Sequence, residues 1–122
     1  LPFFPFSTKP EHLFVLMKER FLAYAKIVLK RDTSTLWKRL TFNYTQMHLM
    51  STMNKMQLWG SKIDFKYFDS IDQEKLTEFT NSCETLMIEI QKTGDGNADD
   101  ALNNCEALMK EIDFDSLEKS RF

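Results

Sequence analysis

The positions of the helix-breaking residues constrain the fold of this chain more than any other feature of its sequence. All three prolines lie within the first ten residues, and the three glycines are Gly60, Gly94 and Gly96. Proline and glycine are the residues that most often interrupt helices and strands. No segment shows the alternation of polar and apolar residues that is typical of a strand. We therefore expect long helices from residue 9 onward.

The first two expected helices have recognisable ends. Thr8 and Glu11 have the spacing of a capping box, so the first helix is expected to begin after Thr8 and to run to the basic pair at 30–31. Capping residues at 32–35 precede the second helix, which is expected to end at residue 58 or 59 with Gly60 as its C-cap. The interval that follows, up to residue 70, breaks the helical spacing and predicts a loop with inward-facing aromatic residues.

Two more helices are expected in the second half of the chain. The third begins between residues 70 and 72 and carries a regular apolar stripe of Leu76, Phe79, Cys83, Leu86 and Ile90. A turn at 93–97 separates it from a fourth helix, and the segment 113–118 is compatible with a short fifth one. These amphipathic segments predict an all-α fold, an antiparallel four-helix bundle.

Length and composition fit one such domain. A chain of 122 residues, 43% hydrophobic and 28% charged, has the size and balance of a single globular unit. Its net charge of -2 argues against binding to nucleic acid, which calls for a basic face. We assign residues 9–122 to the bundle. Residues 1–8 form an apolar lead-in, interpreted either as the exit from a preceding membrane segment or as a tail that packs on the domain.

The two cysteines have a symmetric position. Cys83 and Cys105 each lie 11 residues from Gly94, on the expected core stripes of the third and fourth helices. A hairpin of these helices would place the two thiols at nearly the same level, where a disulfide is geometrically allowed. A core of this size does not need a disulfide, which favours two buried thiols.

No arrangement of residues indicates catalysis, a metal site or a cofactor. His12 and His48 each stand alone in the sequence, and the acidic residues at 95–100 lack the spacing and the closing glutamate of a calcium loop. Four methionines occur at steps of three on the second helix, but each step advances about 300°, so they do not form one copper-binding cluster: Met47, Met50, Met53 and Met56. The chain is therefore not expected to be an enzyme.

Apolar residues lie on several sides of the second helix. This pattern is typical of a helix that contacts more than one neighbour or a partner outside the domain. Methionine-rich surfaces adapt readily to a partner. We expect a partner surface on this helix formed by Phe42, Leu49, Met50, Met53 and Met56.

Two stretches carry a family resemblance. In the first, the run Phe3-Phe4-Pro5-Phe6 and a polar spacer lead into Leu13 to Phe21 and Tyr24, with the pair Arg20-Phe21. The second is 112–122, where Phe114 departs from a common tryptophan. Together they resemble the segments that follow the first and precede the second membrane half of fusaric-acid-resistance and aromatic-acid-exporter proteins.

The resemblance implies a non-catalytic helical domain on the cytoplasmic side of an inner-membrane efflux transporter. Its partners would be the membrane domains of the same chain and other subunits, including further copies of itself, and its role would be assembly or gating. In a reducing compartment the cysteines need no bridge.

Two alternatives stay open at this point. An extracytoplasmic sensor bundle would bind a small molecule between helices, with Asn43, Ser51 and Asn54 as the polar candidates. A free-standing secreted helical interaction protein would instead carry an oxidised pair of cysteines.

Overall fold

The computed structural model describes residues 8–30, 33–92 and 97–120, and within these ranges it contains helices and connections but no strand. The elements in chain order are α1 (Pro10–Leu29), α2 (Leu36–Gly60), the 3-10 turn η1 (Phe65–Tyr67), α3 (Gln73–Gln91), α4 (Ala98–Met109) and α5 (Phe114–Glu118). The predicted all-α helical bundle is confirmed, with the short fifth helix present. Residues 1–7 of the expected lead-in at 1–8 and most of the expected turn at 93–97 lie outside the described residues.

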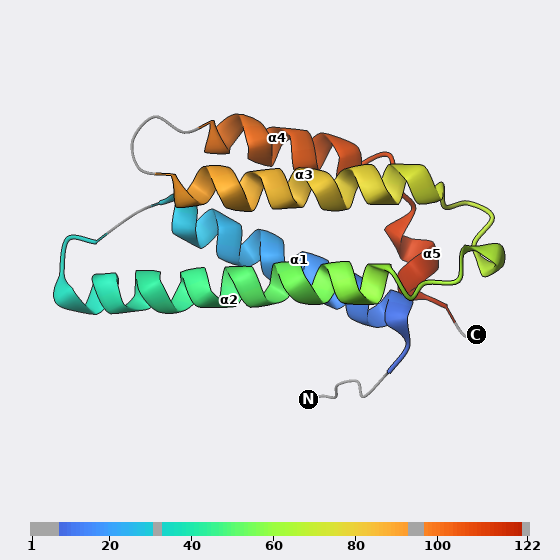
Figure 1. The fold of residues 1–122 in the computed structure, drawn as a ribbon, viewed down its shortest axis with the longest axis horizontal. Helices are drawn as coiled ribbons and strands as arrows, with labels where there is room; N and C mark the ends of the chain where they lie inside the picture. The colour runs from blue at the N-terminus through green and yellow to red at the C-terminus, as the bar shows by residue number, and fades with distance from the viewer. Residues whose placement is uncertain (1–7, 31–32, 93–96, 121–122) are drawn as a thin grey trace.

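Successive long helices run in opposite directions and form two hairpins, α1–α2 and α3–α4 (Figure 1). Helix α1 is the central element because it contacts α2, α3 and α5. Its side chains supply much of the core, including the fully buried Phe14, Phe21 and Val28. α2 contacts α1 along much of its length and also contacts α3. The α3–α4 hairpin therefore lies against α1 and α2 as a second layer.

The start of α1 differs from the sequence-based expectation. The helix begins at Pro10 with Lys9 as its N-cap, and no side chain caps it, so the predicted Thr8–Glu11 capping box is wrong. Glu11 is instead buried, and its Oε1 accepts a hydrogen bond of 2.9 Å from Ser120 Oγ. His12 Nε2 lies 2.8 Å from the carbonyl oxygen of Ser120. Contact with the far end of the chain has replaced the local cap.

Both ends of α2 are defined by specific contacts. The predicted capping cluster is confirmed at Thr35, whose side chain accepts a hydrogen bond from the Lys38 backbone N–H. Gly60 is the last residue of the helix rather than its C-cap, which is Ser61 in a right-handed conformation. A Cβ atom at Gly60 would lie 3.0 Å from Cε1 of Phe14. Glycine is therefore used here because it lets α1 approach the end of α2 closely.

The segment between α2 and α3 forms the predicted loop with a single 3-10 turn. Ile63, Phe68 and Ile71 point into the core from this loop. Asp72 then caps α3 by accepting the backbone N–H of Glu74 at 2.9 Å.

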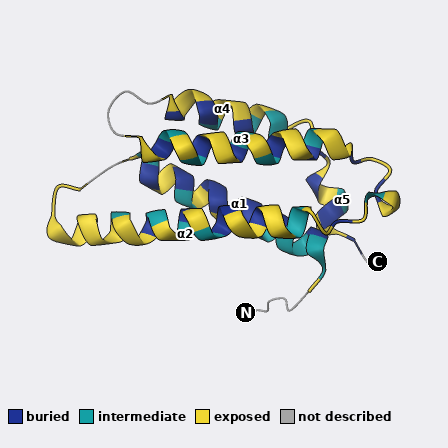
Figure 2. Cartoon of the chain, viewed as in Figure 1, coloured by how far each residue is buried: buried dark blue, intermediate teal, exposed yellow. Residues whose placement is uncertain are grey.

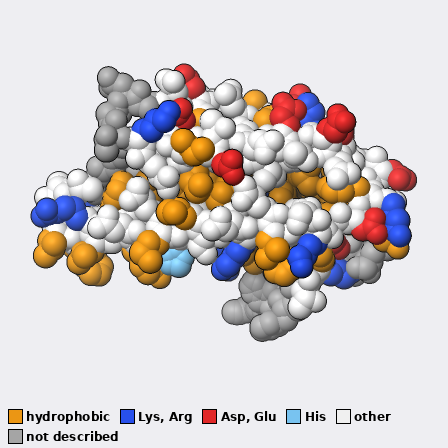
Figure 3. Space-filling view, viewed as in Figure 1, with side chains coloured by type: hydrophobic (Ala, Val, Ile, Leu, Met, Phe, Trp, Pro, Cys, Tyr) orange, Lys and Arg blue, Asp and Glu red, His pale blue; other side chains and the backbone are white. Residues whose placement is uncertain are grey.

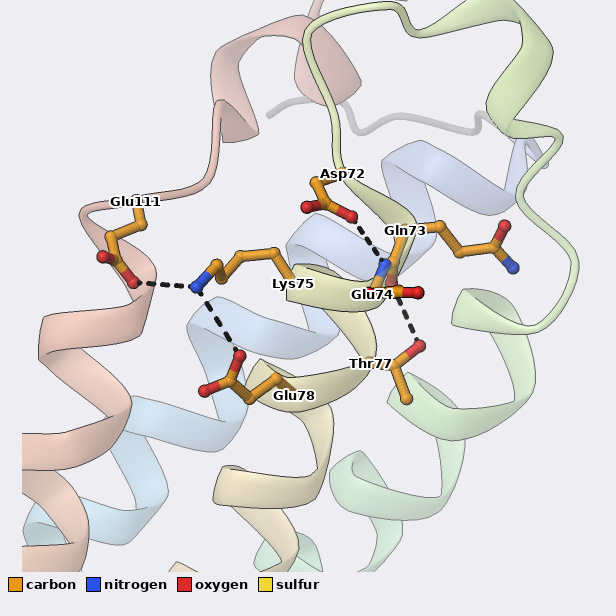
Figure 4. Close-up of polar contacts among 7 residues, drawn as sticks. All are labelled: Asp72, Gln73, Glu74, Lys75, Thr77, Glu78 and Glu111. Atoms are coloured by element: carbon orange, nitrogen blue, oxygen red, sulfur yellow. Dashed lines mark hydrogen bonds and ion pairs between the residues drawn. The ribbon is translucent and has the colours of Figure 1, made fainter.

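Lys75 links the first turns of α3 to the end of α4. Its Nζ lies 3.5 Å from a carboxylate oxygen of Glu111 and 3.6 Å from one of Glu78 (Figure 4). These two carboxylates raise the pKa of Lys75 above its ordinary value. Because the group is solvent-exposed, we expect only a small contribution of these ion pairs to stability.

The predicted core stripe of α3 is confirmed, since all five of its residues are buried. Cys83 on this stripe and Cys105 on α4 are both fully buried free thiols. Hydrogen bonding with Cys105 and burial raise the pKa of the Cys83 thiol well above its ordinary value. Ser82 Oγ also lies 3.3 Å from Cys105 Sγ. In this fold the two cysteines act as small core residues.

Lys18 is the basic residue of α1 that is buried among the core residues of this helix. It is 8% exposed, and its Nζ lies 4.1 Å from the centre of the Phe114 ring on α5. Burial lowers the pKa of Lys18, while nearby carboxylates, Glu19 first among them, oppose the effect. The cation–π contact of the Lys18 ammonium with Phe114 therefore links α1 to α5.

Candidate functional site

Helix α2 exposes a row of large apolar side chains, which we call the α2 outer face. Trp37 is 76% exposed and Met47 is 69% exposed, and the remaining members are between about half and two-thirds exposed. Figure 2 shows this part of α2 as predominantly exposed, and Figure 3 shows hydrophobic side chains projecting from it. The α2 outer face consists of Leu36, Trp37, Leu40, Tyr44, Met47 and Met50.

Helix geometry places this face opposite the core side of α2. Leu40 on the outer face and Leu49 in the core are nine residues apart, and at about 100° per residue they point in opposite directions. The buried residues of the helix share the other side: Thr45, Leu49, Thr52, Met53 and Met56. α2 is therefore apolar on two opposed sides, of which the fold covers one.

This arrangement corrects the partner surface expected from the sequence. Leu49, Met53 and Met56 are at most 1% exposed and belong to the core. Phe42 is partly buried and packs against that core. Of the five expected residues, Met50 alone lies on the outer face.

Two buried threonines explain why the sequence pattern did not identify the core side of α2 as the buried one. Thr45 Oγ1 donates to the carbonyl oxygen of Thr41 at 2.8 Å, and Thr52 Oγ1 donates to that of His48 at 2.9 Å. These local bonds satisfy the hydroxyl groups, so threonine is tolerated on the core side. The signal that would have found the outer face is the three–four spacing of Trp37, Leu40, Tyr44 and Met47.

A hollow lies where the outer face meets the end of α1. Its volume is about 330 Å³, and its lining is mostly apolar and aromatic with two lysines at the edge: Ile27, Lys30, Trp37, Lys38, Thr41 and Phe42. Such a hollow can accept an apolar side chain that has a carboxylate beside it. It gives the outer face a recess as well as projecting side chains.

The two histidines have structural contacts. The His48 ring stacks on Tyr24 of α1 with 5.4 Å between ring centroids, and it meets Tyr44 edge-on at 4.3 Å. His48 therefore fixes the position of Tyr44 on the outer face. In the part of the chain that the structure describes, no group of three or more His, Cys, Asp or Glu residues is placed to hold a metal ion.

The charged residues of α2 are all basic. Residues 36–60 contain Lys38, Arg39 and Lys55 but no aspartate or glutamate. A surface that combines apolar and aromatic side chains with positive charge fits a partner that is apolar and acidic. The polar residues considered for a sensor do not form a pocket on this helix, since Asn43 and Asn54 are exposed on its outer side.

Among the described residues, no helix is long and apolar enough to cross a membrane. Comparisons of the chain with protein-family models, with curated proteins and with solved structures found no match.

Proposed function

We propose that this domain is a non-catalytic docking module that binds another protein surface through the α2 outer face. The observation that carries the proposal is the row of six large, exposed apolar side chains opposite the core side of α2. Together they offer on the order of several hundred Å² of apolar surface, as much as the largest patch on a typical monomer, and such patches mark interaction sites. Tryptophan, tyrosine and methionine are also the residues enriched at protein interfaces.

The sequence resemblance supports a more specific setting. Residues 3–24 and 112–122 resemble the segments that flank the soluble domain of fusaric-acid-resistance and aromatic-acid-exporter proteins. In that setting the domain lies on the cytoplasmic side of an inner-membrane efflux transporter. Docking of α2 on another subunit, or on the membrane domains of its own chain, would assemble or gate the transporter.

Site-specific photocrosslinking in the full-length protein tests the docking role. A photoreactive phenylalanine analogue at Leu40 or Met47 should give a discrete adduct in cells, because both positions lie within the buried area of the proposed interface. The same analogue at Tyr67, which is half exposed in η1, is the matched control and should give none. Absence of adducts from Leu40 and Met47 would count against the proposal.

The transporter setting has its own test in the reading frame around this domain. Several long apolar segments on each side, with basic residues at the junctions, would support it. A single apolar segment on each side would contradict it and favour a sensor. The crosslinking experiment tests the docking role of α2 independently of this setting.

A further inference from the structure

The near-neutral net charge of the chain conceals a strong separation of charge. Residues 1–71 contain 11 Lys or Arg and 5 Asp or Glu, a net charge of +6, whereas residues 72–122 contain 5 and 13, a net charge of -8. The boundary coincides with the start of α3, so the fold places the two signs in different layers. Figure 3 shows the acidic side chains mainly over α3 and α4 and basic side chains along the edge formed by α2.

The acidic layer contains a groove between α3 and α4. It has a volume of about 470 Å³, with small and apolar residues along it and a carboxylate on each helix side: Glu78, Ser82, Asn104, Ala107, Leu108 and Glu111. Asp100 lies on the same side of α4 by helical spacing, since it precedes Asn104 and Ala107 by four and seven residues, and Glu111 lies in the turn just after α4. The groove therefore carries Glu78, Asp100 and Glu111, the first and last of which pair with Lys75, and it has room for the side chains of an incoming helix.

From this complementarity we infer that the α2 outer face binds the acidic α3–α4 groove of a second copy of the chain. The inference rests on the proposed docking function of that face and names its partner. Leu36 to Met50 span about 21 Å along α2, and Asp100 to Glu111 span about 16 Å along α4 and the turn that follows it, so the two surfaces are similar in length. Arg39 and Lys55, which flank the outer face, would lie beside the carboxylates of the groove.

Charge disfavours the simplest alternative arrangement. Two α2 outer faces packed on each other would join two helices that carry Arg39 and Lys55 beside that face and no carboxylate. Like charges across an interface are unfavourable. Binding of α2 to the opposite layer of another copy avoids this repulsion. Such a contact joins two different surfaces, so it repeats head to tail and gives a ring or a chain rather than a two-fold dimer.

Charge reversal on each surface separately tests the inference with the 122-residue chain. Arg39→Glu/Lys55→Glu reverses the charge beside the α2 outer face, and Asp100→Lys/Glu111→Lys reverses the groove. In sedimentation velocity at low salt, the wild type should associate, and each variant alone should show a dissociation constant raised by about tenfold or more. An equimolar mixture of the two variants should associate again, because each supplies the charge that the other has lost.

The matched control reverses two carboxylates outside the groove. Asp69→Lys/Asp99→Lys makes the same change in net charge and, like Asp100→Lys, removes an acidic residue from the first turn of α4. It should associate like the wild type. Circular dichroism of every variant should show unchanged helicity, so that loss of association is not loss of folding.

Three outcomes would overturn the inference. Undiminished association of the groove variant, with loss in the α2 variant, would show that α2 pairs with α2, which leaves the proposed docking function intact. A wild type that stays monomeric would exclude the second copy as partner, and the crosslinking of Leu40 would then decide the docking function by itself. A monomer that sediments with phosphatidylglycerol vesicles would instead assign the α2 outer face to an acidic lipid surface.

Discussion

Two leucines on opposite sides of α2 give a matched pair of substitutions. Leu49 is fully buried and Leu40 is 55% exposed, and both lie within the same helix. Leu49→Ala and Leu40→Ala change helix propensity equally, so any difference between them reports the environment of the side chain. We expect Leu49→Ala to destabilise the fold strongly and Leu40→Ala to leave the free energy of unfolding of the monomer almost unchanged.

The size of the effect follows from burial. Removing three carbon atoms at about 0.8 kcal/mol each costs roughly 2.4 kcal/mol, and the cavity that remains brings the total for Leu49→Ala to about 3–4 kcal/mol. An unfolding entropy of about 2.1 cal/mol/K per residue makes 1 kcal/mol worth roughly 4 °C in a chain of this length. The melting temperature should therefore fall by about 12–16 °C. Leu40→Ala should shift the free energy of unfolding by no more than about 0.5 kcal/mol.

Urea and thermal unfolding followed by circular dichroism measure both quantities. The scans need several protein concentrations, because loss of association also lowers the apparent stability of a self-associating chain. At the lowest concentration the contrast between the two variants should be largest. If Leu40→Ala destabilises the monomer as much as Leu49→Ala, the assignment of the two sides of α2 is wrong, and with it the basis of the α2 outer face.

Three further predictions concern the core. Burial lowers the pKa of Lys18 below 10.5, so just below that pH the unfolded chain binds more protons than the folded chain. The stability of the wild type relative to Lys18→Met, measured by urea unfolding at several pH values, should therefore rise as the pH increases toward 10.5. Gly60→Ala gains up to about 1 kcal/mol of helix propensity, but the contact with Phe14 should make it destabilising in urea unfolding, and Phe14→Leu should reverse that sign in a double-mutant cycle. Ser120→Ala removes the hydroxyl that donates to the buried Glu11 carboxylate and should cost about 1.5–3 kcal/mol, whereas Ser120→Thr should retain more of the stability if the hydroxyl is the cause.

Local sequence signals predicted most of the helices well. The stripe and the start of α3, the capping residue Thr35 and the short helix after Asp113 all depend on contacts within one or two turns of the chain. Such contacts depend on spacing and side-chain chemistry alone. The Thr8–Glu11 cap had the same local signal, yet it failed because Ser120, more than a hundred residues away, competes for the carboxylate.

The candidate site was predictable only in part. The sequence indicated that α2 has more apolar surface than one core contact needs, and it placed Met50 on the surface. It did not indicate which of the two apolar sides the other helices cover. Net charge was similarly uninformative, because the sum of -2 does not show that the two signs occupy different layers.

The sequence by itself determined that this chain is helical, where its helices lie and which residues share a face of each helix. These properties depend on backbone preferences and on a fixed rotation per residue, which act over a few neighbouring positions. The tertiary structure alone decided which side of α2 is buried, what Glu11 binds and how the charges are layered. Those outcomes depend on which surfaces distant segments bury together, and a buried contact gains free energy only after the whole bundle has brought its partners into place.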